Sequence, residues 1–231
     1  MKILVFIPAR GGSKGIKKKN LAEIGSKKLI DYSLDLASKL PNYCRTFVSS
    51  DNNEIIRHCK NKGFNNNYKR PKLLSSDNSD IVDGVIHAIN WLEKEENYYP
   101  DAVLLLQPTS PFRNLGEFKS AIVKFKKQKI VSMFGVVKMK EHPRECIVVK
   151  NQKWSYLKKR NNTINRRQGY ENNYYFIDGN FYLAKTSFIK KNRSFILENK
   201  SIVYKFKKDY SIDIDEMSDL RLARAISMIN N

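Results

Sequence analysis

A glycine-rich, basic segment near the N-terminus carries the most distinctive chemistry of the chain. It runs Pro8-Ala9-Arg10-Gly11-Gly12-Ser13-Lys14-Gly15, and Lys19-Asn20 follow a few residues later. A glycine-rich turn leaves backbone N–H groups uncovered, so phosphate oxygens can approach them closely. Arg10 and Lys19 supply the positive charge that a triphosphate and a departing pyrophosphate need. The segment predicts a nucleotide-binding loop, with an ordinary basic surface turn as the alternative.

The spacing of this loop differs from the two commonest nucleotide-binding motifs. P-loop proteins carry GxxxxGK[ST] and dinucleotide-binding folds carry GxGxxG. Neither pattern matches Pro8–Gly15. Kinase, ATPase and dehydrogenase functions therefore lack their usual sequence support.

A pair of carboxylates lies near the C-terminus, in the run Ser211-Ile212-Asp213-Ile214-Asp215. A strand-like alternation points Asp213 and Asp215 to the same side of the chain. Paired carboxylates suit Mg²⁺, which takes one or two of them and completes its shell with phosphate oxygens and water. On its own an Asp-x-Asp is also typical of a solvated strand edge or a helix cap. The presence of the glycine-rich loop favours a metal site.

Two further polar segments could contact a ligand. Leu105-Leu106-Gln107-Pro108-Thr109-Ser110-Pro111-Phe112-Arg113 contains two prolines that fix the backbone, and Gln107 can both donate and accept hydrogen bonds to a polyhydroxylated ligand. Arg70-Pro71 with Leu74-Ser75-Ser76-Asp77 is a looser segment of the same kind. Either could instead be a plain surface loop.

The elements that must position these residues alternate between strands and helices in the first half of the chain. The predicted strands are Ile3–Ile7, Thr46–Ser49 and Ala102–Leu106, and the predicted helices are Leu29–Leu40, Asp51–Lys60 and Ile81–Leu92. This alternation is typical of a parallel sheet covered by helices. Ligands of such sheets bind at the carboxyl ends of the strands, where the glycine-rich loop and Gln107 lie.

The second half of the chain does not continue this regular alternation of strands and helices. After a strand at Val131–Val137, the region of about 138–175 lacks a helical period and predicts an inserted set of strands and loops, suited to dimer contact or to covering the substrate. Phe181–Leu183 and Ile202–Phe206 are predicted strands. Glu216–Ile229 is a predicted closing helix with Leu222, Ile226 and Ile229 on its buried side. We expect one domain over residues 1–231.

Composition narrows the classes of function. The formal net charge of +20 attracts polyanions, although the lysines are spread along the whole chain and a base-composition bias of the genome would also explain them. A basic nucleic-acid-binding protein is therefore the rival from a different class. No apolar run is long enough for a membrane helix, and Ile3–Ile7 is too short for a signal peptide, so we expect a cytoplasmic protein.

Cysteines and histidines are predicted to have no chemical role. Cys44, Cys59 and Cys146 lack any CxxC or Cys/His spacing that could assemble a metal site, which favours reduced thiols. His58, His87 and His142 have no partner at catalytic spacing. The sequence identifies no general base.

Taken in order, PARGGSKG, KN, RP with a following SSD, LLQPTSPFR and SIDID with a final helix resemble the acylneuraminate cytidylyltransferases, or CMP-sialic acid synthetases. The resemblance covers the chain nearly end to end. It implies a single α/β domain of Rossmann-like, glycosyltransferase-A-like type, with a mostly parallel sheet flanked by helices. It also implies a homodimer that uses Mg²⁺ and CTP, and a nine-carbon 2-keto sugar acid whose anomeric hydroxyl attacks the α-phosphate. The related KDO cytidylyltransferases lack the Gly-Gly-Ser-Lys-Gly run and match less well.

The resemblance also implies roles for individual residues. Arg10 and Lys19 would hold the phosphates and, with Asp213, act in catalysis, while Asp213 and Asp215 would bind the metal. The nucleotide would contact Pro8, Ala9, Arg10, Gly11, Gly12, Ser13, Lys19, Asn20, Arg70, Asp77 and Ser79. The sugar would contact Gln107, Arg167, Tyr182 and Phe195.

The departures from the family pattern fall where the sugar would bind. Members that use sialic acid have an arginine shortly before an Asn-Gly, whereas this chain reads Tyr175-Phe176-Ile177-Asp178-Gly179-Asn180-Phe181-Tyr182. Arg166-Arg167-Gln168 resembles the family's other arginine in this region and could pair with a carboxylate. Legionaminic and pseudaminic acid are therefore as open as sialic acid, and another sugar acid or another nucleoside triphosphate remains an alternative.

Overall fold

A mostly parallel sheet forms the centre of the molecule. The computed structural model describes residues 1–158, 174–207 and 212–229, and within them the main sheet has the strand order β11-β6-β10-β5-β1-β4, with β9 paired to β6. The strands are β1 (Ile3–Pro8), β4 (Cys44–Ser49), β5 (Ala102–Leu105), β6 (Ser132–Lys138), β9 (Tyr175–Phe176), β10 (Tyr182–Lys185) and β11 (Ile202–Lys205). β1 is parallel to β4 and β5, and β6 is parallel to β11, whereas β10 is antiparallel to β5 and β6. The predicted α/β class is confirmed.

Helices connect and cover the strands. They are α1 (Leu29–Ser38), α2 (Asn53–Asn61), α3 (Ile81–Glu95), α4 (Leu115–Lys127), α5 (Thr186–Asn192) and α6 (Met217–Ile229), with short 3-10 turns at Lys19–Leu21, Lys72–Ser75 and Pro143–Glu145. Asn52, Asp80 and Asn114 cap α2, α3 and α4 by accepting hydrogen bonds from backbone N–H groups of the first turn. None of the described helices combines the length and low charge that crossing a bilayer requires.

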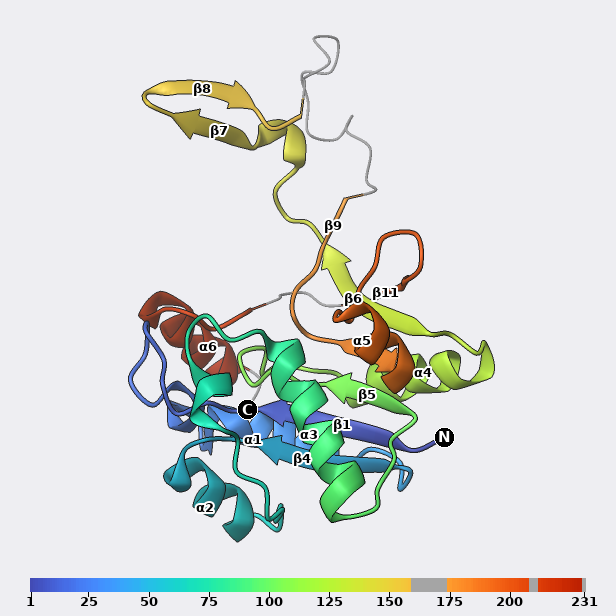
Figure 1. The fold of residues 1–231 in the computed structure, drawn as a ribbon. Helices are drawn as coiled ribbons and strands as arrows, with labels where there is room; N and C mark the ends of the chain where they lie inside the picture. Colours follow the sequence, from blue (N-terminus) through green and yellow to red (C-terminus); the bar gives the residue numbers. More distant parts are fainter. Residues whose placement is uncertain (159–173, 208–211, 230–231) are drawn as a thin grey trace.

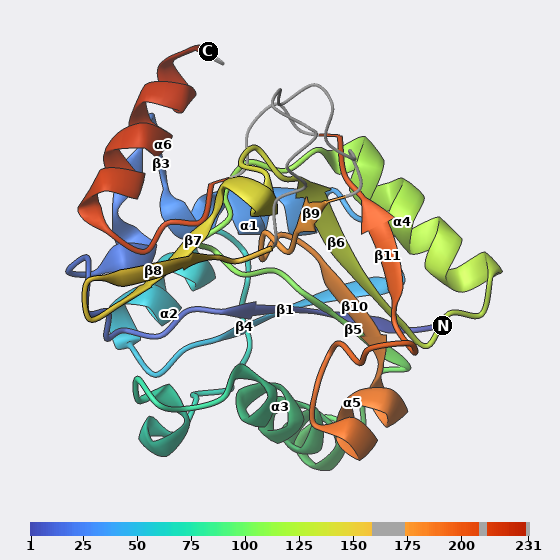
Figure 2. The ribbon, with the colours of Figure 1, turned by 90° about the horizontal axis from the view of Figure 1, so that it is seen from above.

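Side chains of β1 point alternately to the two faces of the sheet, and each face forms its own core with the helices that cover it. Ile3, Val5 and Ile7 point to one face of the sheet, where they join a core with α1, α2 and α4. Leu4 and Phe6 point to the other face and pack with α3 and α5. Figure 2 shows this arrangement, with α3 and α5 on one side of the strands and α1 and α4 on the other.

A third, smaller core lies beside the carboxyl end of β1. Ile16, Ile24 and Leu29 pack there against Ile212, Ile214 and the inner side of α6. This cluster fixes the stretch that carries Asp213 and Asp215 next to the glycine-rich loop. A small hairpin of β2 (Glu23–Ile24) and β3 (Lys27–Lys28) lies between the glycine-rich loop and α1.

The face of α6 that packs on the core differs from the predicted one. Leu222 and Ile229 are 54% and 83% exposed, while Leu220 and Ala223 are buried with Ile226. The prediction was wrong because Leu222 and Ile229 continue an apolar spacing that the neighbouring elements do not cover. Tertiary packing selected the adjacent stripe of the helix.

A hairpin stands away from the body of the molecule. β7 (Ile147–Lys150) and β8 (Lys153–Tyr156) pair antiparallel, and every residue in both strands is exposed. Figure 1 shows the hairpin projecting beyond the end of β6, in the region expected to be an insertion. The hairpin falls within the inserted strands and loops predicted for about 138–175, whereas α4 and α5 were not predicted.

Candidate active site

The glycine-rich loop leaves the carboxyl end of β1 and is fixed by hydrogen bonds on both sides. The Ala9 N–H donates to the Ser49 carbonyl at 2.9 Å, and the Gly11 N–H donates to Asp51 Oδ1 at 2.8 Å. Asn20 Nδ2 donates to the Arg10 carbonyl at 2.9 Å, which closes the loop on itself. The loop therefore has a defined shape before any ligand binds.

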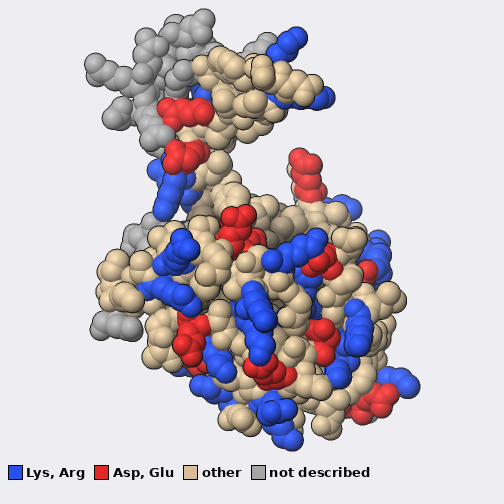
Figure 3. All heavy atoms as spheres, turned by 90° about the vertical axis from the view of Figure 1, so that its left-hand side faces the viewer, with Lys and Arg blue, Asp and Glu red and all other residues tan. Residues whose placement is uncertain are grey.

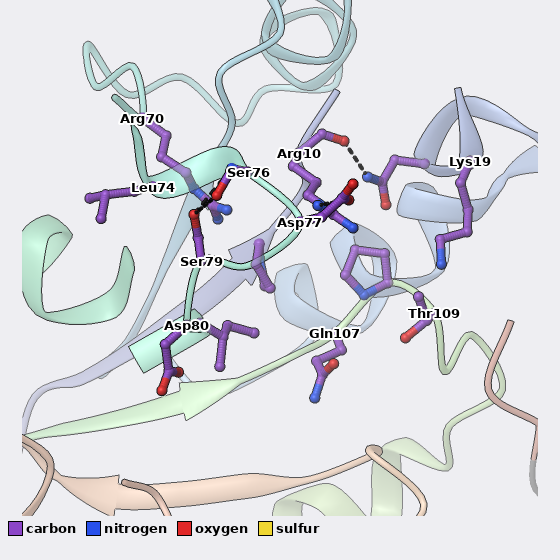
Figure 4. Close-up of a pocket in the computed structure, with 14 residues that line it drawn as sticks. Arg10, Lys19, Arg70, Leu74, Ser76, Asp77, Ser79, Asp80, Gln107 and Thr109 are labelled. Carbon is purple, nitrogen blue, oxygen red and sulfur yellow. Dashed lines mark hydrogen bonds and ion pairs between the residues drawn. The ribbon is translucent and has the colours of Figure 1, made fainter. Parts of the chain in front are cut away.

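A cavity of about 230 Å³ opens beside this loop. Three separate segments line it: the loop itself, residues 70–81, and the turn after β5 (Figure 4). The lining includes the predicted residues Pro8, Arg10, Lys19, Asn20, Arg70, Asp77, Ser79 and Gln107. The cavity therefore joins most of the residues that sequence reasoning assigned to a nucleotide or a sugar.

Other lining residues were not assigned from the sequence. They are Leu74, Ser76, Asp80, Ile81, Pro108 and Thr109. Each of them lies near an assigned residue in the same segment. The sequence signal that could have identified them was the polar character of that segment. Of the loop residues assigned to the nucleotide, Ala9 is fully buried, and Gly11, Gly12 and Ser13 are not among the lining residues.

The cations around the cavity are held by specific partners. Arg10 Nη1 pairs with Asp77 Oδ1 at 2.6 Å, and Lys14 Nζ pairs with Asp77 Oδ2 at 3.3 Å. The hydrogen bond from Arg10, with help from Lys14, holds the pKa of Asp77 below its ordinary value. Arg70 is 6% exposed and donates to the Ser49 hydroxyl at 2.8 Å and the Ser49 carbonyl at 3.0 Å. Arg70 therefore ties the segment over the cavity to the end of β4.

Lys19 links the loop to the aspartate pair. Lys19 Nζ donates to the Ile214 carbonyl and to Asp215 Oδ1, both at 2.9 Å. Ile212 and Ile214 are buried, whereas Asp213 and Asp215 are exposed, so both carboxylates are on the same side as predicted. The structure assigns no strand to this stretch. The alternation comes from the third core, which anchors the two isoleucines.

The aspartates fit a hard divalent cation. The Asp213 carboxyl is partly shielded from water, and this desolvation raises its pKa, as does the nearby negative charge of Asp215, while a hydrogen bond with Thr109 opposes the shift. A bound cation would offset both the desolvation of the Asp213 carboxylate and its repulsion by Asp215. Among residues 1–158, 174–207 and 212–229, no group of three or more His, Cys, Asp or Glu side chains is arranged to hold a metal ion.

The turn before β10 approaches the same place from the opposite side. Gly179 has a φ of +72°, and a Cβ built on it would lie 3.7 Å from Asp213 Oδ2 and 3.9 Å from Gln107 Nε2. The Ser110 hydroxyl donates to the Asp178 carbonyl at 3.2 Å. Gln107, Asp213 and Gly179 therefore lie close together beside the cavity.

The remaining predicted sugar contacts lie elsewhere or are not described. Tyr182 and Phe195 face each other with ring centroids 6.2 Å apart, but neither is among the cavity-lining residues. Phe195 is 5% exposed and belongs to the core on the α3 side of the sheet. Arg167 lies outside the described residues.

Histidines and cysteines are placed away from the cavity lining. His58 bonds Asp31 at 2.6 Å between α2 and α1, and His87 bonds the Tyr68 hydroxyl at 3.0 Å. All three cysteines are free, and burial raises the pKa of Cys59 to about 12.

Comparison with known proteins gives a consistent set of similarities. The family model described as Cytidylyltransferase matches residues 4–230. A pseudaminic acid cytidylyltransferase of Campylobacter jejuni is 30% identical over 100% of this chain and 98% of its own length. A CMP-N,N'-diacetyllegionaminic acid synthase of Legionella pneumophila is 34% identical over 53% of this chain and 52% of its own length.

Solved structures show the same fold. The structure of CMP:2-keto-3-deoxy-manno-octonic acid synthetase complexed with CTP superposes with a TM-score of 0.73 at 13% identity, and covers 100% of both chains. A 4-diphosphocytidyl-2C-methyl-D-erythritol synthase from Anaerococcus prevotii gives a TM-score of 0.66 at 15% identity, over 98% of this chain and 96% of that one. At these identities the likeness concerns the fold alone.

Proposed function

This chain belongs to the cytidylyltransferase family, and from that membership we propose that it transfers CMP from CTP to a nonulosonic acid, a nine-carbon sialic-acid-like sugar, and releases pyrophosphate. The observation that carries the proposal is the cavity at the carboxyl ends of β1 and β5. It joins Arg10, Lys19, Asn20 and Arg70 in one lining, and Lys19 connects that lining to the aspartate pair. The phosphates of CTP need positive charge around them, and the metal needs carboxylate ligands. The cavity supplies the cations, and the aspartate pair beside it supplies the carboxylates.

The proposed reaction is an in-line displacement at the α-phosphorus. The anomeric oxygen of the sugar forms a new bond to the α-phosphorus, the bond from that phosphorus to the bridging oxygen of the β-phosphate breaks, and the hydroxyl proton leaves to solvent. Arg10 and Lys19 stabilise the negative charge that collects on the departing pyrophosphate. Gln107 would hydrogen-bond the sugar from the turn after β5 and hold its hydroxyl near the phosphorus.

We propose Asp213 and Asp215 as the residues that hold Mg²⁺. Bound there, Mg²⁺ would withdraw negative charge from the phosphate oxygens. Asp213 is the better placed of the two, because the Asp215 carboxylate already pairs with Lys19. Lys19 would thus keep Asp215 oriented and share its charge.

The names of the relatives and one departure in the sequence support the choice of sugar class. The pseudaminic acid enzyme matches over the full chain, whereas the legionaminic acid synthase and an N-acylneuraminate cytidylyltransferase of Escherichia coli match over 53% and 49% of it. Asp178 occupies the region where sialic-acid members have an Asn-Gly preceded by arginine. We therefore expect pseudaminic acid to be a better substrate than N-acetylneuraminic acid.

We also propose that the protein works as a homodimer in the cytoplasm, where CTP is made. The projecting hairpin supports dimerisation, since Val149 and Trp154 are 64% and 59% exposed and face each other in its register. Apolar surface of this kind usually marks an interface.

Pyrophosphate release with CTP and Mg²⁺ tests the function. Pseudaminic, legionaminic, N-acetylneuraminic and KDO acids are compared as acceptors, UTP and ATP replace CTP in parallel, and Asp213→Ala is the inactive control. We expect rapid release with one nonulosonate and CTP only. Release with another nucleotide or with KDO alone would favour the alternative nucleotidyltransferase, and no release with any pair from a folded protein would refute the assignment.

The rival class is a nucleic-acid-binding protein, suggested by the net charge of +20. On the face shown in Figure 3, Lys and Arg side chains are interspersed with Asp and Glu rather than gathered in one patch. Binding to generic duplex DNA measured at several salt concentrations separates the two, because the rival predicts steep salt dependence without CTP turnover.

A further inference from the structure

Arg113 has no assigned role, yet its guanidinium group joins three parts of the fold. Nη2 donates to the Gln107 carbonyl at 2.5 Å, Nε donates to the Asn180 carbonyl at 3.3 Å, and Nη1 donates to the Ser33 hydroxyl at 3.0 Å. Gln107 follows β5, Asn180 precedes β10, and Ser33 is a fully buried residue of α1. One side chain therefore fixes the distance between the two segments that lie close to Asp213.

The guanidinium group of Arg113 is partly buried. Burial lowers the pKa of Arg113 to about 9, and the nearby Asp178 and Asp213 carboxylates favour its charged form. At neutral pH the guanidinium therefore stays positive. A partly buried positive group with three donors in use is a rigid tie, since each hydrogen bond to a charged group is stronger than one between neutral groups.

The segment that Arg113 holds includes a buried asparagine side chain. The Asn180 side chain is fully buried, and its amide oxygen and nitrogen make no hydrogen bond within the described part of the chain. Two side chains bond the carbonyl groups of this turn, Arg113 at Asn180 and Ser110 at Asp178. Gly179, between these two residues, is the one that faces Gln107 and Asp213.

We propose that Arg113 is a positioning residue for the acceptor sugar: it holds Gln107 and the Asp178–Asn180 turn at a fixed separation on the side of the site away from the triphosphate. The proposal rests on the proposed function, because it is the acceptor whose binding Arg113 governs. None of the three Arg113 contacts is to Arg10, Lys19, Asn20 or Arg70. Loss of the tie therefore weakens binding of the sugar and leaves CTP binding nearly unchanged.

Arg113→Lys is the test variant. Lysine keeps the positive charge, but a single ammonium on a flexible stem cannot donate to three carbonyl and hydroxyl groups in the planar geometry of arginine. We expect KM for the sugar to rise on the order of tenfold, with the dissociation constant for CTP, measured by calorimetry without sugar, within about threefold of wild type. Arg45→Lys is the matched control, because Arg45 pairs with Glu96 and stacks on Tyr98 away from the cavity.

A second variant keeps the proposal testable if Arg113→Lys does not fold. Ser33→Ala removes only the α1 end of the tie and creates little space, so it should fold even if Arg113→Lys does not. We expect a rise of about threefold in KM for the sugar. In a double-mutant cycle, Arg113→Lys and Gln107→Ala should be non-additive in sugar KM, because both act through the placement of the same residue.

Hydrogen exchange supplies a readout that does not depend on turnover. Arg113→Lys should speed exchange at residues 107–110 and 178–180 selectively. Equal increases in sugar KM and in the CTP dissociation constant, additive double variants, or exchange that rises throughout the protein would each overturn the proposal in favour of a general structural role. An inactive wild-type enzyme would instead refute the proposed function, whereas an active one with unchanged sugar KM in Arg113→Lys would refute this inference alone.

Discussion

At the scale of single residues, Lys19 connects the cavity to the aspartate stretch. Its ammonium group is bonded to the Ile214 carbonyl and to Asp215, and its side chain is 14% exposed while it lines the cavity. Lys14, five residues earlier, is 77% exposed and contacts Asp77 at 3.3 Å. The two lysines lie close together in the sequence but differ in burial and in number of contacts. Lys14 can therefore serve as the control for Lys19.

Lys19→Ala should lower kcat about 100-fold, because it removes a fixed positive charge from the site of pyrophosphate departure and frees Asp215. Lys14→Ala should change kcat by less than about threefold, since solvent screens an exposed ion pair. Steady-state kinetics with saturating CTP and sugar measure both. Equal losses in the two variants would argue that the loop acts only through its overall charge.

At the scale of elements, the close approach of the glycine-rich loop to the aspartate stretch sets the geometry. A Cβ on Gly15 would lie 2.3 Å from the Asp215 carbonyl oxygen, so the two backbones can meet only because residue 15 has no side chain. A Cβ on Gly12, in the same loop, would meet nothing within 4 Å. Packing between these segments, and not the loop alone, places Lys19 beside the carboxylates.

Gly15→Ala should reduce stability by about 1–3 kcal/mol, since the backbone atoms must move apart to admit the methyl group. The same shift should lower kcat, because it moves Asp213 and Asp215 relative to Lys19. Urea unfolding measures the first effect and initial rates the second. Gly12→Ala is the control for stability and should stay within about 0.5 kcal/mol of wild type; an equally stable Gly15→Ala protein would contradict the close packing.

α4 supports the turn that carries Gln107 and Arg113. Asn114 caps the helix directly after that turn, and Phe118 is fully buried against Phe181 and Phe206 at ring-centroid distances of 5.2 and 5.4 Å. Val123, on the outer side of the helix, is 42% exposed. The helix therefore has one strongly buried side.

Phe118→Ala should cost about 3–5 kcal/mol of unfolding free energy, because it leaves a cavity among aromatic rings. Val123→Ala should cost less than about 1 kcal/mol, since most of its surface already faces water. Denaturant unfolding monitored by circular dichroism checks both values. A small loss for Phe118→Ala would mean that the aromatic cluster is not tightly packed.

At the scale of the whole molecule, contacts among the described residues of one chain do not account for the stability of the projecting hairpin. A two-stranded hairpin on its own is marginally stable, and all residues of β7 and β8 are exposed, including Val149 and Trp154. α6 presents a second exposed apolar side, with Leu222 and Ile229. These are alternative places for the interface of the proposed dimer.

The double variant Val149→Glu, Trp154→Glu should convert the dimer to a monomer, because it places charges on the apolar hairpin. Leu222→Glu on α6 should leave the dimer intact. Sedimentation equilibrium over a range of protein concentrations measures the mass of each. Dissociation by Leu222→Glu instead would move the interface to α6, and a monomeric wild-type protein would refute the dimer proposal.

The sequence by itself determined the class of fold and identified segments that the structure brings together around the cavity. Strands at Ile3–Ile7, Thr46–Ser49 and Ala102–Leu106 were predictable because short apolar runs buried on both faces of a parallel sheet contain a strong local signal. The glycine-rich loop and the Asp213–Asp215 pair were predictable because their residue types are suited to phosphate and metal. Family membership, tested by comparison, agrees with that interpretation.

Only the tertiary structure decided how these segments meet. Lys19 and Ile214 are 195 positions apart in the chain, so no local sequence pattern indicates the hydrogen bond that joins them. The buried side of α6 and the three-way contact of Arg113 also depend on which elements pack against them. Local patterns specify backbone periodicity, whereas these features arise from contacts between residues far apart in the chain.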